Sequence, residues 1–106
     1  MVIIYSTFPD KISAEKLSRT LLQKKLVACV QFFQIDSSYL WKGKILESKE
    51  FACFLKTQNK LKGIVIDFIS QNHPYEIPEI TIFPTTSTNK KYLKWLARET
   101  KTKTPV

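Results

Sequence analysis

The chain has 106 residues, of which 43% are apolar and 12% aromatic, and 17 basic side chains against nine acidic ones give it a formal net charge of +8. This composition excludes a disordered chain and predicts one folded domain over residues 1–106. No apolar run reaches the roughly 20 residues of a membrane-spanning helix. No basic segment precedes an apolar one at the N-terminus, so a secretory signal is not expected and the predicted compartment is the cytoplasm.

The N-terminal segment predicts a strand followed by a helix. Residues 2–7 are mostly apolar and β-branched, which is typical of a strand. Pro9 and Asp10 then open a helix, with Asp10 as its N-cap. Ala14, Leu17 and Leu21 form an apolar stripe at helical spacing.

Extended segments follow. Residues 26–33 and 51–56 are rich in apolar and aromatic side chains and predict two strands. Residues 37–45 predict an extension that carries Tyr39 and Trp41, with a turn at Lys42-Gly43-Lys44. Gly43 is one of only two glycines in the chain, which excludes a glycine-rich phosphate loop or dinucleotide-binding fingerprint.

The C-terminal part predicts a helix, a strand and a short helix. Asn59 is expected to cap a helix with the clearest amphipathic spacing in the chain, carried by Leu61, Ile64, Val65, Phe68 and Ile69. Residues 79–83 predict a strand with Ile80 and Ile82 on one face. Asn89 is expected to cap the last helix, whose inward side chains are Tyr92, Leu93 and Leu96.

The resulting order is β-α-β-β-α-β followed by a small helix. This is the order of the ferredoxin-like fold, an α+β architecture with a four-stranded antiparallel sheet and two helices on one face. The strand at residues 51–56 is apolar at both alternating sets of positions, as strands buried on both faces are. A second layer is therefore expected on the other face, and a like subunit is the simplest candidate.

Residues 73–79, with the sequence His-Pro-Tyr-Glu-Ile-Pro-Glu, connect the second predicted helix to the last predicted strand. Pro74 and Pro78 fix their own φ angles and restrict the residue before each of them, so the segment is expected to be stiff and extended. It holds His73, the only histidine of the chain. Alone, the segment is compatible with a rigid connector and with a catalytic or metal-binding loop.

Two other groups of residues have simple interpretations. Cys29 and Cys53 lack CxxC or Cys/His spacing and are expected to be buried, reduced thiols. The denser basic patch is compatible with weak binding of nucleic acid or an anionic surface, but a solvated lysine face is the favoured explanation. No specific nucleic acid and no membrane partner are therefore expected; the patch consists of Lys90, Lys91, Lys94, Arg98, Lys101 and Lys103.

Six segments in register resemble the CutA (divalent-cation tolerance) family over essentially the whole chain. No single motif is decisive, but their order and spacing together are highly specific. They are Tyr5-Ser6-Thr7-Phe8-Pro9-Asp10, Lys25-Leu26-Val27-Ala28-Cys29-Val30, Ser38-Tyr39-Leu40-Trp41-Lys42-Gly43-Lys44, Leu55-Lys56-Thr57, residues 73–79, and Tyr92-Leu93-Lys94-Trp95-Leu96.

The resemblance implies a ferredoxin-like protomer in a homotrimer, with an architecture like that of the PII signalling proteins. It also implies a link to tolerance of divalent metals, copper in particular, and some members are described as binding copper. No catalytic activity and no required cofactor come with the family, so we expect a non-enzymatic protein whose ligand is copper or another divalent cation. The alternative is a PII-like regulatory module that binds a small anion or a protein partner.

The resemblance places the candidate site in a cleft between subunits. The predicted metal ligands are His73, Glu76 and Glu79, and the predicted cleft residues are Tyr39, Trp41, Lys56, Tyr75 and Cys29. The chain departs from the copper-binding pattern of some relatives, which have Cys in place of Ser6 and a second His in place of Asn72. Because one subunit offers few soft ligands, a copper site is expected to be weak or shared between subunits. The two glutamates lack a partner nucleophile, so no catalytic residue is predicted.

Overall fold

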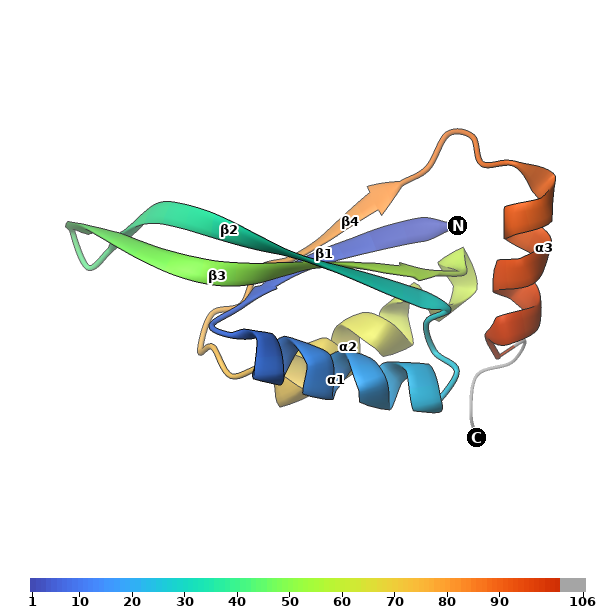
Figure 1. Ribbon diagram of the computed structural model, residues 1–106, viewed down its shortest axis with the longest axis horizontal. Helices are drawn as coiled ribbons and strands as arrows, with labels where there is room; N and C mark the ends of the chain where they lie inside the picture. Colours follow the sequence, from blue (N-terminus) through green and yellow to red (C-terminus); the bar gives the residue numbers. More distant parts are fainter. Residues whose placement is uncertain (102–106) are drawn as a thin grey trace.

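The computed structural model describes residues 1–101 and shows a twisted sheet with two helices packed on one face (Figure 1). The sheet is antiparallel, and its strand order is β2-β3-β1-β4. The predicted ferredoxin-like α+β architecture is therefore confirmed. Along the chain the elements are β1 (Val2–Phe8), α1 (Lys11–Gln23), β2 (Cys29–Trp41), β3 (Lys44–Thr57), a 3-10 turn η1 (Asn59–Leu61), α2 (Lys62–Asn72), β4 (Ile80–Pro84) and α3 (Lys90–Glu99).

The start of α1 follows the sequence-based prediction. The Asp10 carboxylate accepts a hydrogen bond from the backbone N–H of Ser13 at 2.7 Å, and the Ser13 hydroxyl donates to the Asp10 carbonyl at 3.2 Å. These bonds satisfy groups that the first turn of a helix leaves unpaired. The helix then buries Ala14, Leu17 and Leu21, as its apolar stripe predicts.

The middle of the chain is one long hairpin rather than the shorter separate strands predicted at residues 26–33, 37–45 and 51–56. β2 and β3 pair from Cys29 with Lys56 to Trp41 with Lys44. Lys42 and Gly43 join them with φ angles of 51° and 78°, which are the left-handed angles of a two-residue hairpin turn. The prediction missed the continuity because the centre of β2 is polar and exposed.

Two predicted helix caps need correction. Asn59 does not cap α2; it begins the 3-10 turn, and its side-chain oxygen accepts a hydrogen bond from Lys62 Nζ at 3.0 Å. Asn89 does stand at the N-cap position of α3, but its side chain makes no capping hydrogen bond. Both helices therefore begin without a side-chain cap.

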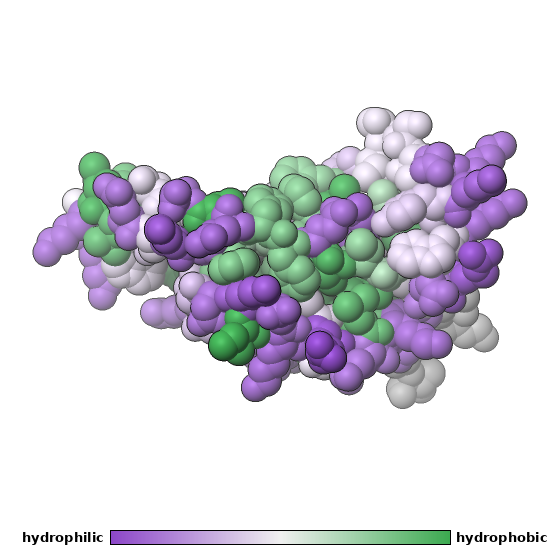
Figure 2. All heavy atoms as spheres, in the orientation of Figure 1, coloured by the Kyte–Doolittle hydropathy of each residue, from purple (hydrophilic) through white to green (hydrophobic). Residues whose placement is uncertain are grey.

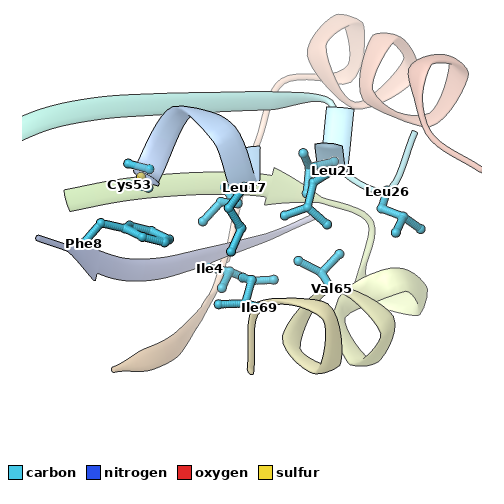
Figure 3. Packing of buried hydrophobic residues seen from close by; sticks show 11 residues of the cluster. Ile4, Phe8, Leu17, Leu21, Leu26, Cys53, Val65 and Ile69 are labelled. Atoms are coloured by element: carbon cyan, nitrogen blue, oxygen red, sulfur yellow. The ribbon is translucent and has the colours of Figure 1, made fainter. Parts of the chain in front are cut away.

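The core lies between the sheet and the helices α1 and α2 (Figure 3). Ile4 and Phe8 of β1 are fully buried there, together with Leu21, Val65 and Ile69 from the two helices. Ile80 and Ile82 of β4 pack against the same cluster. The apolar spacing of both helices thus predicted the correct buried faces.

The opposite face of the sheet, here called the open face, carries a row of aromatic rings across all four strands. Phe33, Phe54, Tyr5 and Phe83 follow one another from β2 to β4, with ring centroids 5.1, 5.7 and 6.3 Å apart. Apolar residues gather over the middle of the molecule and hydrophilic ones over α3 in Figure 2. The expectation that both faces of the strands carry apolar side chains is therefore met.

The helix α3 lies at the end of the sheet remote from the hairpin tip (Figure 1). Gln58 Nε2 donates to Thr100 Oγ1 at 2.7 Å, and the Lys101 backbone N–H donates to the Lys25 carbonyl at 2.9 Å, which fastens the end of this helix. Of the predicted inward side chains only Leu96 is fully buried; Tyr92 and Leu93 are half-buried. Lys103 of the basic patch lies outside the described residues.

The two cysteines differ in burial. Cys53 is fully buried in the core, and burial raises the pKa of its thiol to about 12, so it stays protonated at neutral pH. Cys29 is half-buried on the open face, which corrects the prediction that both thiols are buried. Both are free. None of the helices within residues 1–101 is long and apolar enough to cross a membrane.

Candidate functional site

The connector at residues 73–79 is fastened to β1 at both of its ends. Near its start, His73 Nε2 lies 2.8 Å from the carbonyl oxygen of Thr7. At its end, the Ser6 hydroxyl donates a hydrogen bond to the Glu79 carbonyl at 2.7 Å. The side chain of Ser6 is completely buried, so this bond is shielded from water. The two bonds fix the connector against the strand. Its backbone bends at residues 74–77, so the connector is not extended throughout as its prolines predicted.

His73 is held by three further contacts, one of which defines its tautomer. The Tyr75 backbone N–H donates to its Nδ1 at 3.0 Å, so the proton sits on Nε2 and is donated to Thr7. The imidazole stacks on the Phe8 ring, with centroids 4.4 Å apart and planes 17° from parallel, and lies 5.1 Å from the Tyr75 ring. Burial lowers the pKa of His73, against smaller opposing effects of the Thr7 carbonyl and Glu50.

Tyr75 places its hydroxyl group against a buried carboxylate. The hydroxyl donates to Glu50 Oε2 at 2.6 Å, and the Glu50 side chain is only 8% exposed. Burial and this carboxylate together raise the pKa of Tyr75, so the phenol stays protonated and remains a donor. Sequence analysis did not identify Glu50, because it lies 25 positions from Tyr75 and nothing in its own neighbourhood distinguishes it from other strand glutamates.

A pocket of about 570 Å³ lies between the connector and the long hairpin; we call it the hairpin pocket. Its floor is the open face of β1, β2 and β3, and its wall is formed by the connector. Its polar groups are three carboxylates and several hydroxyls, and its apolar surface comes from four aromatic rings and four aliphatic side chains. The lining residues are Tyr5, Thr7, Ile35, Ser37, Ser38, Tyr39, Trp41, Leu46, Glu50, Pro74, Tyr75, Glu76, Ile77 and Glu79.

The charge of the hairpin pocket is opposite to that of the whole chain. Glu50, Glu76 and Glu79 line it, and among residues 1–101 no lysine or arginine does, although basic side chains outnumber acidic ones in the sequence by 17 to nine. Burial, followed by the charges of Glu79 and Glu50, raises the pKa of Tyr5. Carboxylates grouped in a partly enclosed space favour a cation over an anion.

The structure brings most of the predicted cleft residues together and separates two of them. Tyr39, Trp41 and Tyr75 line the hairpin pocket with both predicted glutamates of the connector. Lys56 and Cys29 do not; they pair with each other across β2 and β3. Lys56 lies six residues along β3 from Glu50, or roughly 20 Å at the rise of a strand.

Lys56 has a different neighbour from the one predicted. Its ammonium lies 5.5 Å from the centroid of the Tyr92 ring of α3. A lysine over the face of an aromatic ring gains a modest cation–π attraction. Within one subunit, Lys56 therefore belongs to the contact between the sheet and α3 and not to the hairpin pocket.

The predicted metal ligands are only partly available within one subunit. Both ring nitrogens of His73 are hydrogen-bonded, so binding a metal requires that one of these bonds break. The Glu79 carboxylate accepts a hydrogen bond from the Thr81 hydroxyl at 2.9 Å. Among residues 1–101, three or more His, Cys, Asp or Glu side chains do not gather closely enough to hold a metal ion. A metal site at His73, Glu76 and Glu79 stays a prediction, which requires ligands from a second subunit or a weak site.

The lowered pKa of His73 gives a testable titration. The folded protein releases this proton at a lower pH than the unfolded chain, whose histidine titrates near 6.5. The unfolded state therefore binds more protons below about pH 6.5, and the stabilising contribution of neutral His73 is complete above that pH and lost as the pH falls. Because the chain has one histidine, a single imidazole NMR resonance reports its pKa. We expect a midpoint below that of the urea-unfolded chain; an equal or higher midpoint contradicts this assignment.

Comparison with known proteins identifies the family. Residues 2–99 match the family model described as CutA1 divalent ion tolerance protein. The chain is 44% identical over 101 residues to the divalent-cation tolerance protein CutA of Pyrococcus horikoshii, covering 95% of this chain and 99% of that protein. It is 38% identical over 97 residues to protein CutA of Homo sapiens, covering 91% of this chain and 54% of that protein.

Solved structures agree with the sequence comparison. A crystal structure of CutA1 from Pyrococcus horikoshii superposes with a TM-score of 0.93 at 42% identity, covering 95% of this chain and 99% of that chain. A structure of the divalent cation tolerance protein from Thermus thermophilus superposes with a TM-score of 0.88 at 29% identity, covering 95% and 100%. With a family match over nearly the whole described chain and the same fold in its relatives, this chain belongs to the CutA1 divalent ion tolerance family.

Proposed function

We propose that this chain is a non-enzymatic protein of divalent-cation tolerance or response that binds a divalent cation, copper included, weakly at the hairpin pocket. The observation that carries the proposal is that Glu50, Glu76 and Glu79 line that pocket and that no basic side chain from the described part of the chain does. The names of the relatives, which refer to divalent cations, support the same ligand class. A PII-like site for a small anion fits this pocket poorly, because its carboxylates repel anions.

The proposed assembly is a homotrimer in which a neighbouring subunit packs against the open face and the hairpin, so that the hairpin pocket becomes part of a cleft between two subunits. Within residues 1–101, seven of the eleven large apolar side chains that are exposed belong to β2 and β3, and Leu40 and Ile45 near the hairpin tip are 74% and 75% exposed. Exposed apolar patches of this kind mark interfaces. Light scattering is expected to give three times the 12.3 kDa chain mass. A monomer at micromolar concentration contradicts the trimer.

The proposed compartment is the cytoplasm, where reducing conditions keep thiols free. Cys29 and Cys53 are both free in the structure. Relatives carry other locations in their names: one from Arabidopsis thaliana is called chloroplastic, and a structure from Archaeoglobus fulgidus is called periplasmic. Fractionation of the source cells tests the assignment, and recovery outside the cytoplasm overturns it.

Copper binding is tested by calorimetric titration of copper(II) into the wild type and two variants. We expect weak, saturable heat that decreases several-fold in the Glu76→Gln/Glu79→Gln variant, because two oxygen ligands lose their charge. His73→Ala reports whether the imidazole leaves the Thr7 carbonyl to bind the metal. Heat that is unchanged by His73→Ala removes His73 from the ligand set, and the absence of heat in the wild type rejects copper as the ligand.

A further inference from the structure

The end of the molecule at α3 gathers basic side chains from three separate parts of the chain. The backbone N–H of Lys101, just after α3, donates to the carbonyl of Lys25, in the turn after α1, at 2.9 Å. Lys60 of η1 lines a groove whose other side is formed by α3. All members of this surface except Lys101 are exposed. We call it the basic end, and it consists of Lys24, Lys25, Lys60, Lys94, Arg98 and Lys101.

The surroundings of the basic end contain little negative charge and no exposed apolar patch. Among residues 24–25, 58–62 and 90–101 the one acidic side chain is Glu99. None of the eleven large apolar side chains that are exposed within residues 1–101 lies in these three segments, and Figure 2 shows hydrophilic residues gathered over α3. The basic end therefore lacks the apolar surface that marks the proposed contact between subunits on β2 and β3.

One member of the basic end has a backbone conformation that lysine rarely adopts. Lys25 has a φ angle of 58°, in the left-handed region where glycine is the usual residue after a helix. Its N–H donates to the Leu22 carbonyl and the Leu26 N–H donates to the Leu21 carbonyl, both at 3.0 Å, which is the bonding pattern of such a helix end. Because glycine fits this turn at a lower cost, the fold alone does not account for a lysine at position 25.

We propose that the basic end binds the phosphate backbone of a nucleic acid without reading its base sequence. Five of its six cations are lysines, which pair with phosphates as point charges and need no fixed bidentate geometry. A nucleic acid releases condensed counterions when lysines replace them, so lysines spread over a surface are sufficient for binding. A protein partner or a lipid surface is expected to contact exposed apolar side chains as well, and this surface has none within the three segments.

The proposed homotrimer strengthens this interaction. A rotation about a threefold axis leaves the height along the axis unchanged, so the three basic ends lie at one level around it. A nucleic acid that reaches two of them gains affinity through effective concentration. The inference does not depend on the metal proposal, since the basic end shares no residue with the hairpin pocket.

The test is the fluorescence anisotropy of a labelled DNA duplex of mixed sequence, titrated with the full chain at several salt concentrations. If all six cations of one subunit contact phosphates, affinity falls about a thousandfold between about 50 and 200 mM salt. In Lys60→Gln/Lys94→Gln we expect weaker binding and a salt dependence that is less steep by about one logarithmic unit for each lysine that contacts a phosphate. The matched control is Lys11→Gln/Lys16→Gln, which removes the same charge from two exposed lysines of α1 outside the basic end.

Lys25→Gly supplies a second test, because it removes a charge where the backbone conformation favours glycine. We expect weaker DNA binding together with a urea midpoint that is unchanged or higher. A lower midpoint with unchanged DNA binding would assign Lys25 to the fold and remove it from the proposed surface.

The remaining outcomes decide the proposal itself. Binding that Lys60→Gln/Lys94→Gln weakens more than the control supports it. No DNA binding at low salt, or equal weakening in Lys11→Gln/Lys16→Gln, overturns it and leaves the copper titration to decide the metal proposal. Binding to phosphatidylserine vesicles or to polyglutamate that is as tight as binding to DNA overturns the choice of nucleic acid as the partner.

Discussion

Replacing Phe8 with alanine is expected to lower the free energy of unfolding by about 3–5 kcal/mol, the usual cost of removing a buried phenylalanine. Phe8 is completely buried at the end of β1 and forms part of the core. Its ring is also the surface on which the His73 imidazole stacks at 4.4 Å. The substitution therefore removes core packing and loosens the start of the connector together. Urea denaturation at one fixed protein concentration measures the loss, since assembly makes stability concentration-dependent.

Two companion variants separate these effects. Phe8→Leu keeps the site apolar and removes only the ring, so we expect a smaller loss of unfolding free energy than in Phe8→Ala. We also expect the chemical shift of the His73 imidazole to move toward that of the unfolded chain. Ile12→Ala, at a position that is 78% exposed, is expected to change stability by less than about 0.5 kcal/mol. If Phe8→Ala costs no more than Ile12→Ala, the described packing of the connector on the core is wrong.

Replacing Tyr75 with phenylalanine is expected to cost about 1–3 kcal/mol, the penalty for leaving a buried polar group without its partner. The variant keeps the ring and removes the hydroxyl that donates to Glu50 Oε2 at 2.6 Å. Glu50 is 8% exposed, so water replaces this donor only in part. The loss is measured as the shift of the urea midpoint.

Tyr39→Phe is the matched control, because Tyr39 lines the same pocket but is 42% exposed. We expect almost no change in stability from it. A double-mutant cycle with Glu50→Gln measures the coupling between the two partners of the hydrogen bond. Additive losses at Tyr75 and Glu50 speak against a direct bond between them and favour independent packing effects.

The order of elements could be predicted because it depends on local patterns. The spacing of Val65 and Ile69 on α2, with Leu61 just before it in η1, and the alternation of Ile80 and Ile82 on β4 each identify a buried face from sequence alone. The long hairpin could not be predicted in full, because the polar residues at the centre of β2 are stabilised by pairing with β3, which is a tertiary effect.

The part of the candidate site that is formed by residues close together in the sequence could be predicted. Residues 73–79 form one short connector, and its Tyr75, Glu76 and Glu79 line the same pocket. Lys56 was grouped with them only through the family resemblance, and the strand carries it away to Tyr92. Glu50 was missed because its burial and its bond to the connector arise only when β3 and the connector meet.

Ser6 gains a structural explanation. The family resemblance implies that some relatives have a cysteine at this position as a copper ligand. In this chain the Ser6 hydroxyl instead donates a hydrogen bond to the Glu79 carbonyl at 2.7 Å. His73 is likewise used within the fold, since each of its ring nitrogens has a backbone partner. Ser6 and His73, which the family resemblance associates with a metal site, thus fasten the connector to β1. The carboxylates of the hairpin pocket supply its negative charge.

The central claim is that the hairpin pocket selects cations. The chain has two tryptophans, so a Trp95→Phe variant leaves Trp41 of the pocket as the only indole reporter. Its fluorescence is titrated with copper(II) and, in parallel, with inorganic pyrophosphate. We predict saturable quenching by copper(II) and no response to pyrophosphate. A saturable response to pyrophosphate without one to copper(II) would contradict the claim and favour a PII-like anion site.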